Sequence, residues 1–268
     1  MYGYGYSLYN RLSFLGGLDP NASAFLTATG ITDPTIQGAV NSLVVDLKKY
    51  GVWSKMKAIY PFVGGTATTH KFNLVNPADT DAAFRLAFSG GWTHSSTGVA
   101  PNGVNAFANT FFIPRSNLTI GSNSQGQYQR ENKQDSGFRG VWDNTTAYRL
   151  EICTQSVSFG NTCRTIANGA DLNPAAIADT RGLVLSKSQG GSFKFIRNNT
   201  TIASTTAGST IYPNRPYYLG ANNNNGITAF FSNMSISFSF LGDGLTDTEA
   251  SNLYTAVQKF QTTLGRQV

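Results

Sequence analysis

Two pairs of carboxylates are the residues of this chain whose types could carry out glycoside hydrolysis. Glu131 and Asp135 lie in a polar, loop-like run. Asp79 and Asp81 come just before a segment that we expect to be a strand. Hydrolysis of a glycosidic bond needs two carboxyl groups held at a fixed separation. We interpret both pairs as solvated or turn-capping groups, because a loop does not fix such a separation.

The two histidines, His70 and His94, are the other candidates for acid–base chemistry. A serine nucleophile would need a sharp turn of the type G-x-S-x-G, and the sequence contains none. His94 follows Gly90-Gly91-Trp92-Thr93, so we expect it to begin a strand and to bond a backbone carbonyl. The chain is therefore predicted not to be an enzyme.

The asparagine run from Asn222 to Asn225 could supply oxygen ligands to calcium. Neutral amides without a neighbouring aspartate bind calcium less well than carboxylates do, whereas asparagine readily takes left-handed conformations. We expect a tight turn here, no metal site and no cofactor, with calcium as the alternative. Cys153 and Cys163 lie on neighbouring segments, and we favour free thiols over a disulfide.

Sugar binding normally uses an exposed aromatic ring beside polar side chains. The candidate glycan-binding residues in this chain are Trp92, His94, Tyr128 and Trp142, with Tyr217 as a further aromatic. Aromatic residues of a β-sandwich are also commonly buried. Exposure of each ring therefore decides between a binding role and a core role.

Residues 1–18 alternate tyrosine with glycine and then become apolar. Glycine weakens a strand, and this spacing gives no helical stripe. The segment either folds back on its own domain or docks into a neighbouring subunit. Tyrosine offers a large contact area at low entropic cost, so we favour docking. The predicted partner-binding residues are Tyr2, Tyr4, Tyr6, Tyr9, Arg11 and Phe14, and a homo-oligomer is expected.

The charge of the chain is low in density and positive in sign. Lys and Arg number 20 against 14 Asp and Glu, which gives a net charge of +6, and charged residues make up 13% of the chain. The basic residues are scattered, so we predict no nucleic-acid partner. We also expect no membrane span and no secretory signal, since no segment approaches the length or pattern that either requires.

Helix signals are concentrated near the two ends of the sequence. Asp19-Pro20 and Asp33-Pro34 each pair an N-cap with a proline at the first helical position, so we predict a helical segment over residues 19–60. Its end, Val52 to Ile59, is either a short helix or an irregular join. Thr246 and Glu249 form a capping box before a helix that Gly265 ends. The apolar stripes of these helices should pack on each other or side by side on the sheet.

Short alternating segments fill the middle of the sequence. Phe72 with Leu74, and Phe84 with Leu86 and Phe88, alternate with polar residues, and 193–203 reads as a hairpin. The run 235–240 alternates serine with apolar residues, which predicts a strand with one face in the core and one in water. The fold class is therefore mainly β: an antiparallel two-sheet jelly-roll sandwich with an N-terminal helical segment and one C-terminal amphipathic helix.

Three stretches in this order resemble the laminin-G/concanavalin A-like lectin superfamily, in the variant found in bacteriophage virion structural proteins. They are FRLAFSGGWTHSSTGVAPNGVNAFANT, FKFIRNNTTIAS and the C-terminal YYLGANNNNG with its following strand and helix. The resemblance covers roughly residues 60–268. It implies a jelly roll over 61–268 that follows the arm 1–18 and the helical segment 19–60. Glucanases of that superfamily carry Glu-x-Asp-x-x-Glu on one strand, and this chain lacks the motif.

The resemblance implies a jelly roll that is often glycan-binding and sometimes only structural. Together with the tyrosine–glycine arm, the neutral polar surface and the absence of a secretory signal, its viral variant leads us to expect a non-enzymatic bacteriophage virion structural protein: a capsid decoration, spike, fibre or tail component. The arm 1–18 would anchor it to other virion proteins in a particle assembled in the host cytoplasm. The alternative is a glycan-binding module for host attachment, with a host-surface glycan as partner. A divergent glycoside hydrolase is the third hypothesis.

Overall fold

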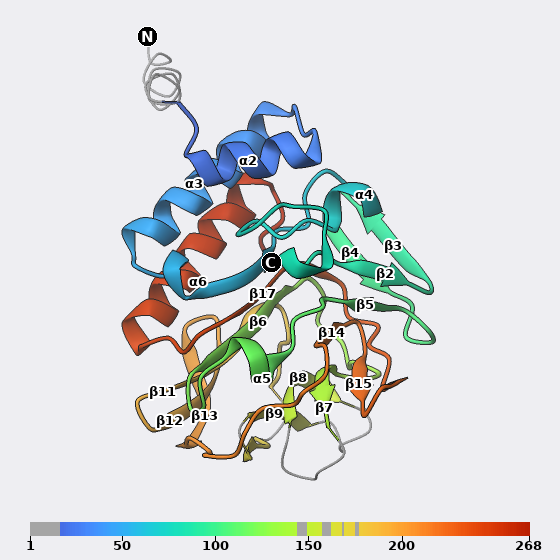
Figure 1. Cartoon of the computed structure of the whole chain (residues 1–268), viewed down its shortest axis with the longest axis vertical. Helices are drawn as coiled ribbons and strands as arrows, with labels where there is room; N and C mark the ends of the chain where they lie inside the picture. Colours follow the sequence, from blue (N-terminus) through green and yellow to red (C-terminus); the bar gives the residue numbers. More distant parts are fainter. Residues whose placement is uncertain (1–16, 144–148, 157–161, 168, 175–176) are drawn as a thin grey trace.

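The chain folds into three layers, a helical layer and two β-sheets (Figure 1). The computed structural model describes residues 17–143, 149–156, 162–167, 169–174 and 177–268. The six residues assigned to the N-terminal arm, Tyr2 to Phe14, lie outside this range, so their predicted role stays a prediction.

The helical layer consists of α2, α3 and α6, which lie together on one side of the molecule in Figure 1. Their bounds are Pro20–Thr29, Pro34–Lys49 and Asp247–Thr263. The shorter helical elements are η1 (Trp53–Lys55), α4 (Ala67–His70), η2 (Asp81–Ala83) and α5 (Pro114–Asn117). None of the helices in the described ranges is long and apolar enough to cross a membrane.

The sheet next to the helices, sheet A, is antiparallel, and its described part has eight strands. Strand β17 lies between β6 on one edge and both β4 and β1 on the other. In order across the sheet the strands are β13 (Thr200–Thr206), β12 (Ser192–Arg197), β11 (Gly182–Gln189), β6 (Asn123–Gln129), β17 (Ile236–Gly242), β4 (Gly98–Pro101) and β3 (Trp92–Ser95), with β1 (Met56–Tyr60) paired to β17.

The second sheet, sheet B, is antiparallel except where β15 runs parallel to β7. Its order in the described residues is β10 (Ala170–Leu172), β9 (Thr162–Ala167), β8 (Arg149–Ser156), β7 (Arg139–Trp142), β14 (Tyr218–Leu219), β5 (Phe107–Asn109) and β2 (Ala87–Ser89), with the hairpin β15 (Asn222–Asn224) and β16 (Ile227–Ala229). The predicted fold class, a mainly β two-sheet sandwich with helices at both ends, is confirmed.

Sheet A is buried on both faces because it is the middle layer. Phe238 and Phe240 of β17 pack with α3 and α6, whereas Ile236 and Leu241 of the same strand belong to the core between the sheets. A register shift between Ile236 and Phe238 places these two residues on opposite faces, and ordinary alternation places Leu241 opposite Phe240. The serines predicted to face water are instead buried: Ser237 is 0% and Ser239 2% exposed. That part of the prediction was wrong because both faces of the sheet are covered. The helices cover the face of Phe238 and Phe240, and sheet B covers the opposite face, to which Ser239 points.

The central strand β6 directs amide side chains into the sandwich. Gln125 Nε2 donates to the carbonyl of Glu151 at 3.0 Å, and Tyr217 Oη donates to Gln125 Oε1 at 2.7 Å. Gln129 and Thr154 bond each other across the two sheets. These bonds replace water for buried amides, and they tie sheet A to sheet B.

The predicted helix ends are confirmed at both ends of the chain. Asp19 and Asp33 cap α2 and α3 with side-chain oxygens, each followed by proline, and Thr246 and Glu249 form the capping box of α6. The helical stripes pack on each other as predicted, since α3 contacts α6. The hairpin β12–β13 is also confirmed, with Asn198 and Asn199 in left-handed conformation at its turn.

Three segments differ from the sequence-based expectation. Of the alternating run 84–88, only the end belongs to a strand, β2. Residues 52–59, predicted as a helix or an irregular join, contain η1 and then β1, which pairs with β17. Residues 72–74 are not a strand, although Phe72 and Leu74 are buried. The Asn73 side chain accepts from Ile59 N and donates to the carbonyl of Ala83, so a single amide takes the place of ladder hydrogen bonds beside β1.

Candidate functional site

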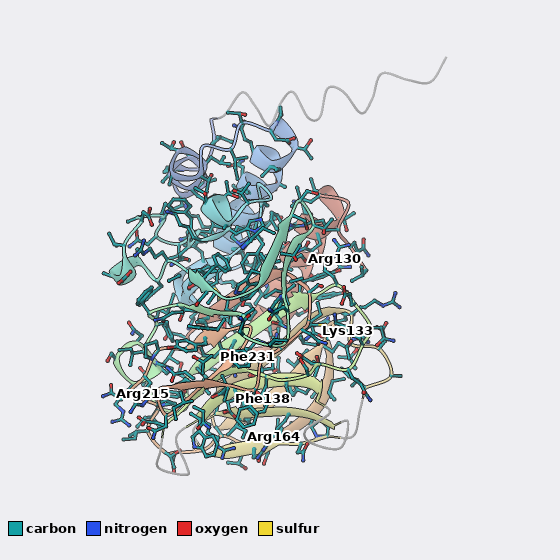
Figure 2. The ribbon with its side chains drawn as sticks, turned by 90° about the vertical axis from the view of Figure 1, so that its right-hand side faces the viewer. Arg130, Lys133, Phe138, Arg164, Arg215 and Phe231 are labelled. Carbon is teal, nitrogen blue, oxygen red and sulfur yellow. The ribbon has the colours of Figure 1, made fainter. Side chains whose placement is uncertain are left out.

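The outer face of sheet B carries the aromatic and charged side chains that form the candidate site. Val141, Leu150 and Leu219 lie in the core between the sheets. Side chains alternate along a strand, so their neighbours Trp142, Arg149, Glu151 and Tyr218 project from the opposite face. Phe107 of β5 stacks on Tyr218, with ring centroids 5.0 Å apart. Figure 2 shows Phe138, Arg164 and Arg215 in the same lower part of the molecule.

Trp142 ends β7, and its ring stacks with a guanidinium. Arg149 is its cross-strand partner on β8, with Cζ 3.9 Å from the ring centroid. Trp142 is half-buried, and its Nε1 is among the buried polar atoms of the described structure without a hydrogen-bond partner. A guanidinium on an indole forms a flat surface with N–H donors at its rim. Such a surface suits stacking of a sugar ring.

Glu151 and Asn222 meet beside Trp142, over Gly140. Both residues are register partners of Gly140, and Asn222 Nδ2 donates to Glu151 Oε1 at 2.7 Å. A Cβ on Gly140 would lie 2.2 Å from the Leu150 carbonyl, so a glycine is needed there. Burial raises the pKa of Glu151 to about 7, although Arg149 and Asn222 oppose the rise. The carboxyl group is therefore close to half protonated at neutral pH.

Two other predicted residues, Trp92 and His94, lie on β3 at the edge of the sandwich and not on this face. Trp92 Nε1 donates to the Phe107 carbonyl at 3.2 Å, which joins sheet A to sheet B. His94 Nδ1 lies 3.0 Å from Nδ1 of His70, so His94 bonds a second histidine and not the backbone carbonyl that we expected.

The histidine pair is neutral. Gly65 N–H donates to His70 Nε2, so the His70 proton resides on Nδ1 and is donated to His94. Burial, with contributions from His94 and Arg266, lowers the pKa of His70 to about 3. Burial also lowers the pKa of His94. The pair holds the loop before α4 against β3, which is a structural task.

Tyr128 does not offer an exposed ring for a sugar. It is 0% exposed on the helix side of sheet A. Its hydroxyl accepts from Val268 N at 3.1 Å, so the tyrosine holds the C-terminal end of the described chain. Burial thus excludes Tyr128 from a binding surface, whereas Trp142 is only half-buried.

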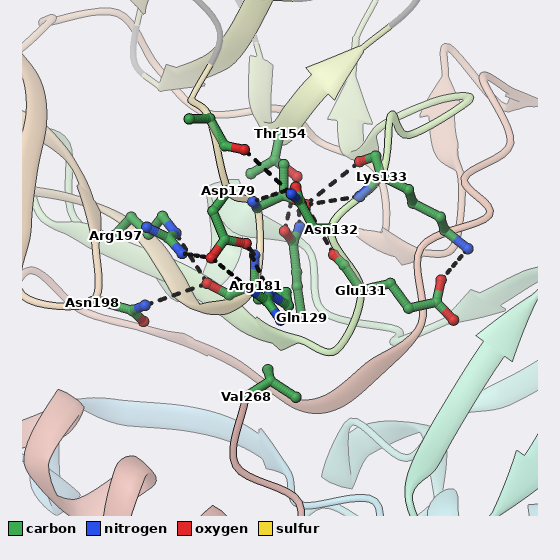
Figure 3. A network of polar contacts seen from close by, with 12 residues as sticks. Gln129, Glu131, Asn132, Lys133, Thr154, Asp179, Arg181, Arg197, Asn198 and Val268 are labelled. Carbon is green, nitrogen blue, oxygen red and sulfur yellow. Dashed lines mark hydrogen bonds and ion pairs between the residues drawn. The ribbon is translucent and has the colours of Figure 1, made fainter.

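The paired carboxylates are held by cations and amides. Asp135 is 0% exposed, pairs with Arg139 and accepts from Ser232 Oγ at 2.8 Å. Glu131 is ion-paired with Lys133 and accepts from Ser235 Oγ, as Figure 3 shows for the lysine. Asp79 and Asp81 both pair with Arg85. Each carboxylate therefore has a structural partner.

Only the end of the asparagine run lies in the predicted tight turn, because Asn222–Asn224 form strand β15. Asn223 Oδ1 accepts from Gly226 N at 2.8 Å, and Asn225 and Gly226 are left-handed at the tip of the β15–β16 hairpin. Within the described ranges no group of three or more His, Cys, Asp or Glu could hold a metal. Cys153 is buried, and the Cys163 side chain lies outside the described part, so the thiol prediction stays a prediction.

Two depressions elsewhere on the surface are polar and lack an aromatic ring in their lining. One of about 180 Å³ is lined by hydroxyls of β3 and the β6 end, including Thr93, Ser95 and Glu131. A more open one of about 420 Å³ is lined by Lys55, Lys57 and Asp243, among others. Without an aromatic plane, neither matches the requirements of a sugar as well as the outer face of sheet B does.

The sequence did not predict that three polar side chains meet beside Trp142. They are Arg149, Glu151 and Asn222. Arg149 and Glu151 were visible only as the polar half of an alternating strand, and Asn222 only as part of a turn. Their contact depends on β15 lying parallel to β7, a pairing between segments far apart in sequence. The glycine at position 140 was the available signal, because an interior strand glycine often marks a close approach.

No family model and no curated protein matches the sequence. Solved structures do match its fold. A mutant of the Trypanosoma rangeli sialidase displaying trans-sialidase activity aligns with a TM-score of 0.50 at 11% identity, over 82% of this chain and 39% of that one. This chain thus spans well under half the length of that sialidase.

Two smaller structures are similar at lower TM-scores. Domain 4 of AbnA, an extracellular GH43 arabinanase from Geobacillus stearothermophilus, was solved in complex with arabinotriose; it aligns at 0.44 and 14% identity over 75% of this chain and 98% of that one. The CBM40 of the Ruminococcus gnavus IT-sialidase, bound to α2,3-sialyllactose, aligns at 0.37 and 19% identity over 52% and 83%. Strand order and the sialidase likeness together give one conclusion: the chain has the fold of a two-sheet, mainly antiparallel β-sandwich.

Proposed function

We propose that this chain is a non-catalytic glycan-binding module whose sugar lies on the outer face of sheet B. The observation that carries the proposal is the stacked pair of Trp142 and Arg149 beside the amide–carboxyl pair of Asn222 and Glu151. A planar aromatic with adjacent amide, guanidinium and carboxyl groups offers both stacking and hydrogen bonds to a sugar.

Side-chain atoms without hydrogen-bond partners also support a binding site on the outer face of sheet B. Trp142 Nε1, Arg149 Nε and Asn222 Oδ1 lack hydrogen-bond partners in the described structure. Buried polar atoms normally have a hydrogen-bond partner, so each of these three atoms needs an explanation. We explain them by a small adjustment of these side chains that presents the atoms to sugar hydroxyls when a glycan binds.

The test is a glycan array followed by calorimetric titration of the full chain. We expect at least one oligosaccharide class to bind, and Trp142→Ala to weaken that binding by tenfold or more. Trp53→Ala is the matched control: Trp53 is also half-buried beneath a cation, Lys48, but lies at the helical layer. It should bind as the unaltered chain does, provided both variants retain the parent's circular dichroism spectrum.

Three outcomes would contradict the proposal. Absence of binding at millimolar sugar, with and without calcium, would reject the glycan-binding function. Equal affinity in the Trp142 and Trp53 variants would reject the site. Release of reducing sugar from a bound glycan would reject the non-catalytic role.

The virion role is a second proposal, supported by the resemblance and by the tyrosine–glycine composition of residues 1–18. In this proposal the arm binds other virion proteins, and the sandwich projects from the particle as a host-attachment module. Removal of residues 1–18 should leave a folded module that no longer joins its assembly. Normal assembly of the shortened chain would contradict the anchoring role.

A further inference from the structure

Two arginines beside Trp142 are held only loosely by carboxylates. Arg149 Nη1 lies 3.9 Å from Glu151, and Arg215 Nε lies 3.5 Å from Asp143. These separations exceed hydrogen-bond distance. The Nε atoms of both arginines are without a hydrogen-bond partner among the described residues. Trp142 and Asp143 are consecutive, so the two guanidiniums lie at the same end of β7.

Arginines elsewhere in the protein make closer pairs. Arg164 Nη2 lies 2.6 Å from Asp171, and Arg181 Nε lies 3.0 Å from Asp179. Arg85 reaches Asp81 at 2.9 Å. An arginine and a carboxylate usually form short, charge-assisted hydrogen bonds, often two in parallel. The pairs at the end of β7 are therefore looser than these three, although the buried Arg139 also lies 3.4 Å from its partner Asp135.

The local charge favours an anion. Arg115 also approaches Asp143, at 3.9 Å, so Arg115, Arg149 and Arg215 face two carboxylates, Asp143 and Glu151. Burial raises the pKa of Glu151 to about 7, which lowers its average charge near neutral pH.

We infer that the glycan bound on the outer face of sheet B is acidic, with a sugar carboxylate held by Arg149 and Arg215 and the sugar ring on Trp142. This inference rests on the proposed function and adds the class of ligand. A carboxylate accepts two parallel N–H bonds from one guanidinium, which supplies the acceptors that the loosely held arginines lack.

The test compares sugars that differ by one carboxylate. Titration of the full chain with 3′-sialyllactose against lactose, and with a glucuronic-acid-ended disaccharide against its glucose counterpart, separates the two common carboxylated sugars. The better acidic probe should bind about tenfold or more tightly than its neutral partner. Arg149→Gln and Arg215→Gln should each reduce that ratio to about threefold or less. Arg181→Gln, an exposed arginine with a close ion pair, is the control and should leave the ratio unchanged.

Each result decides between the ligand class and the function itself. Equal affinity for acidic and neutral partners, abolished by Trp142→Ala, would overturn the acidic preference while the glycan-binding proposal stood. Binding of 3-sulfated lactose as tightly as 3′-sialyllactose would overturn carboxylate recognition in favour of any anion. An acidic preference that survives in both arginine variants would overturn the assigned residues. Absence of binding by every probe would overturn both proposals.

Discussion

Glu151 shows how one residue links the chemistry of the candidate site to the stability of the fold. Its side chain projects from β8 toward Asn222, and its backbone carbonyl accepts from Gln125 and from Thr165 Oγ1. Glu151 is 4% exposed, and burial outweighs the opposing effect of Arg149, whose Nη1 lies 3.9 Å away, so the protonated form of the carboxyl group is favoured in the folded chain. The residue therefore makes folding depend on pH.

The pH dependence has a defined sign. Burial raises the pKa of Glu151 in the folded chain to about 7, from its ordinary value of 4.5, so the folded chain binds this proton more tightly than the unfolded chain. The resulting stability is fully present below pH 4.5 and is lost as pH rises toward 7. Relative to Glu151→Gln, which keeps the bond from Asn222, the parent chain should lose up to about 3 kcal/mol of unfolding free energy across that window.

Urea unfolding of both proteins between pH 4.5 and 8 measures this difference. Measurements above pH 8 are the control, because the difference in unfolding free energy between the parent chain and the variant should be constant there. A constant gap across the entire range would mean that Glu151 titrates normally in the folded chain.

Arg266 is a buried cation that is satisfied by backbone carbonyls. It is 1% exposed and donates to the carbonyls of Phe62, Pro61 and Ser237, and to Gln261 Oε1. Burial lowers its pKa, yet a guanidinium stays charged at neutral pH. The residue joins the end of α6 to the segment after β1 and to β17.

Arg266→Ala should destabilise the fold by about 3–5 kcal/mol, because it leaves several buried carbonyls without donors. Arg181→Ala removes an exposed arginine and should change the unfolding free energy by less than about 0.5 kcal/mol. Denaturant midpoints of the two variants give the comparison. Similar midpoints would show that water replaces the lost donors.

The helix ends and the hairpin turn were predicted from patterns of residues close together in the sequence. The caps of α2, α3 and α6 and the Asn198–Asn199 turn each lie within a few residues, so the sequence alone specifies them. Strand β6 could not be predicted in this way. Its sequence, Asn-Ser-Gln-Gly-Gln-Tyr-Gln, has no apolar alternation, and the amides of Gln125 and Gln129 bond partners on the other sheet.

The cap of α6 can be tested by one substitution made at two places. Thr246→Ala removes the bond from Glu249 N and should cost about 1 kcal/mol. Thr255→Ala, in the exposed interior of the same helix, should be neutral or stabilise by up to about 0.5 kcal/mol, because alanine is the better helix former. Thermal unfolding of both variants measures the contrast. Equal shifts in midpoint would mean that the capping box contributes nothing to the folded chain.

At the scale of the whole molecule, the helical layer and the sandwich share sheet A. Phe238 and Phe240 face α3 and α6, while Ile236 and Leu241 of the same strand face sheet B. β1 extends the sheet from within the segment that the sequence assigned to helices. The boundary predicted between the helical segment 19–60 and the jelly roll 61–268 therefore separates β1 from β17, although these two strands pair in one sheet.

We expect the helical layer and the sandwich to unfold in one cooperative transition. Leu47→Ala in α3 and Leu150→Ala in β8 truncate leucines that are both 0% exposed, one in each core. Each should cost about 2–5 kcal/mol. Because both cores include residues of sheet A, each variant should lower the same midpoint, whether helix is followed by circular dichroism or the sandwich by tryptophan fluorescence.

A Trp53→Phe background makes the two probes independent, since Trp92 and Trp142 then report only on the sandwich. Coincident transitions in both leucine variants are the expected result. If the helical signal of Leu47→Ala is lost well before the tryptophan signal, the sandwich folds without its helical cover. Phe238 and Phe240 would then face water in a stable intermediate, which their size and apolarity make costly.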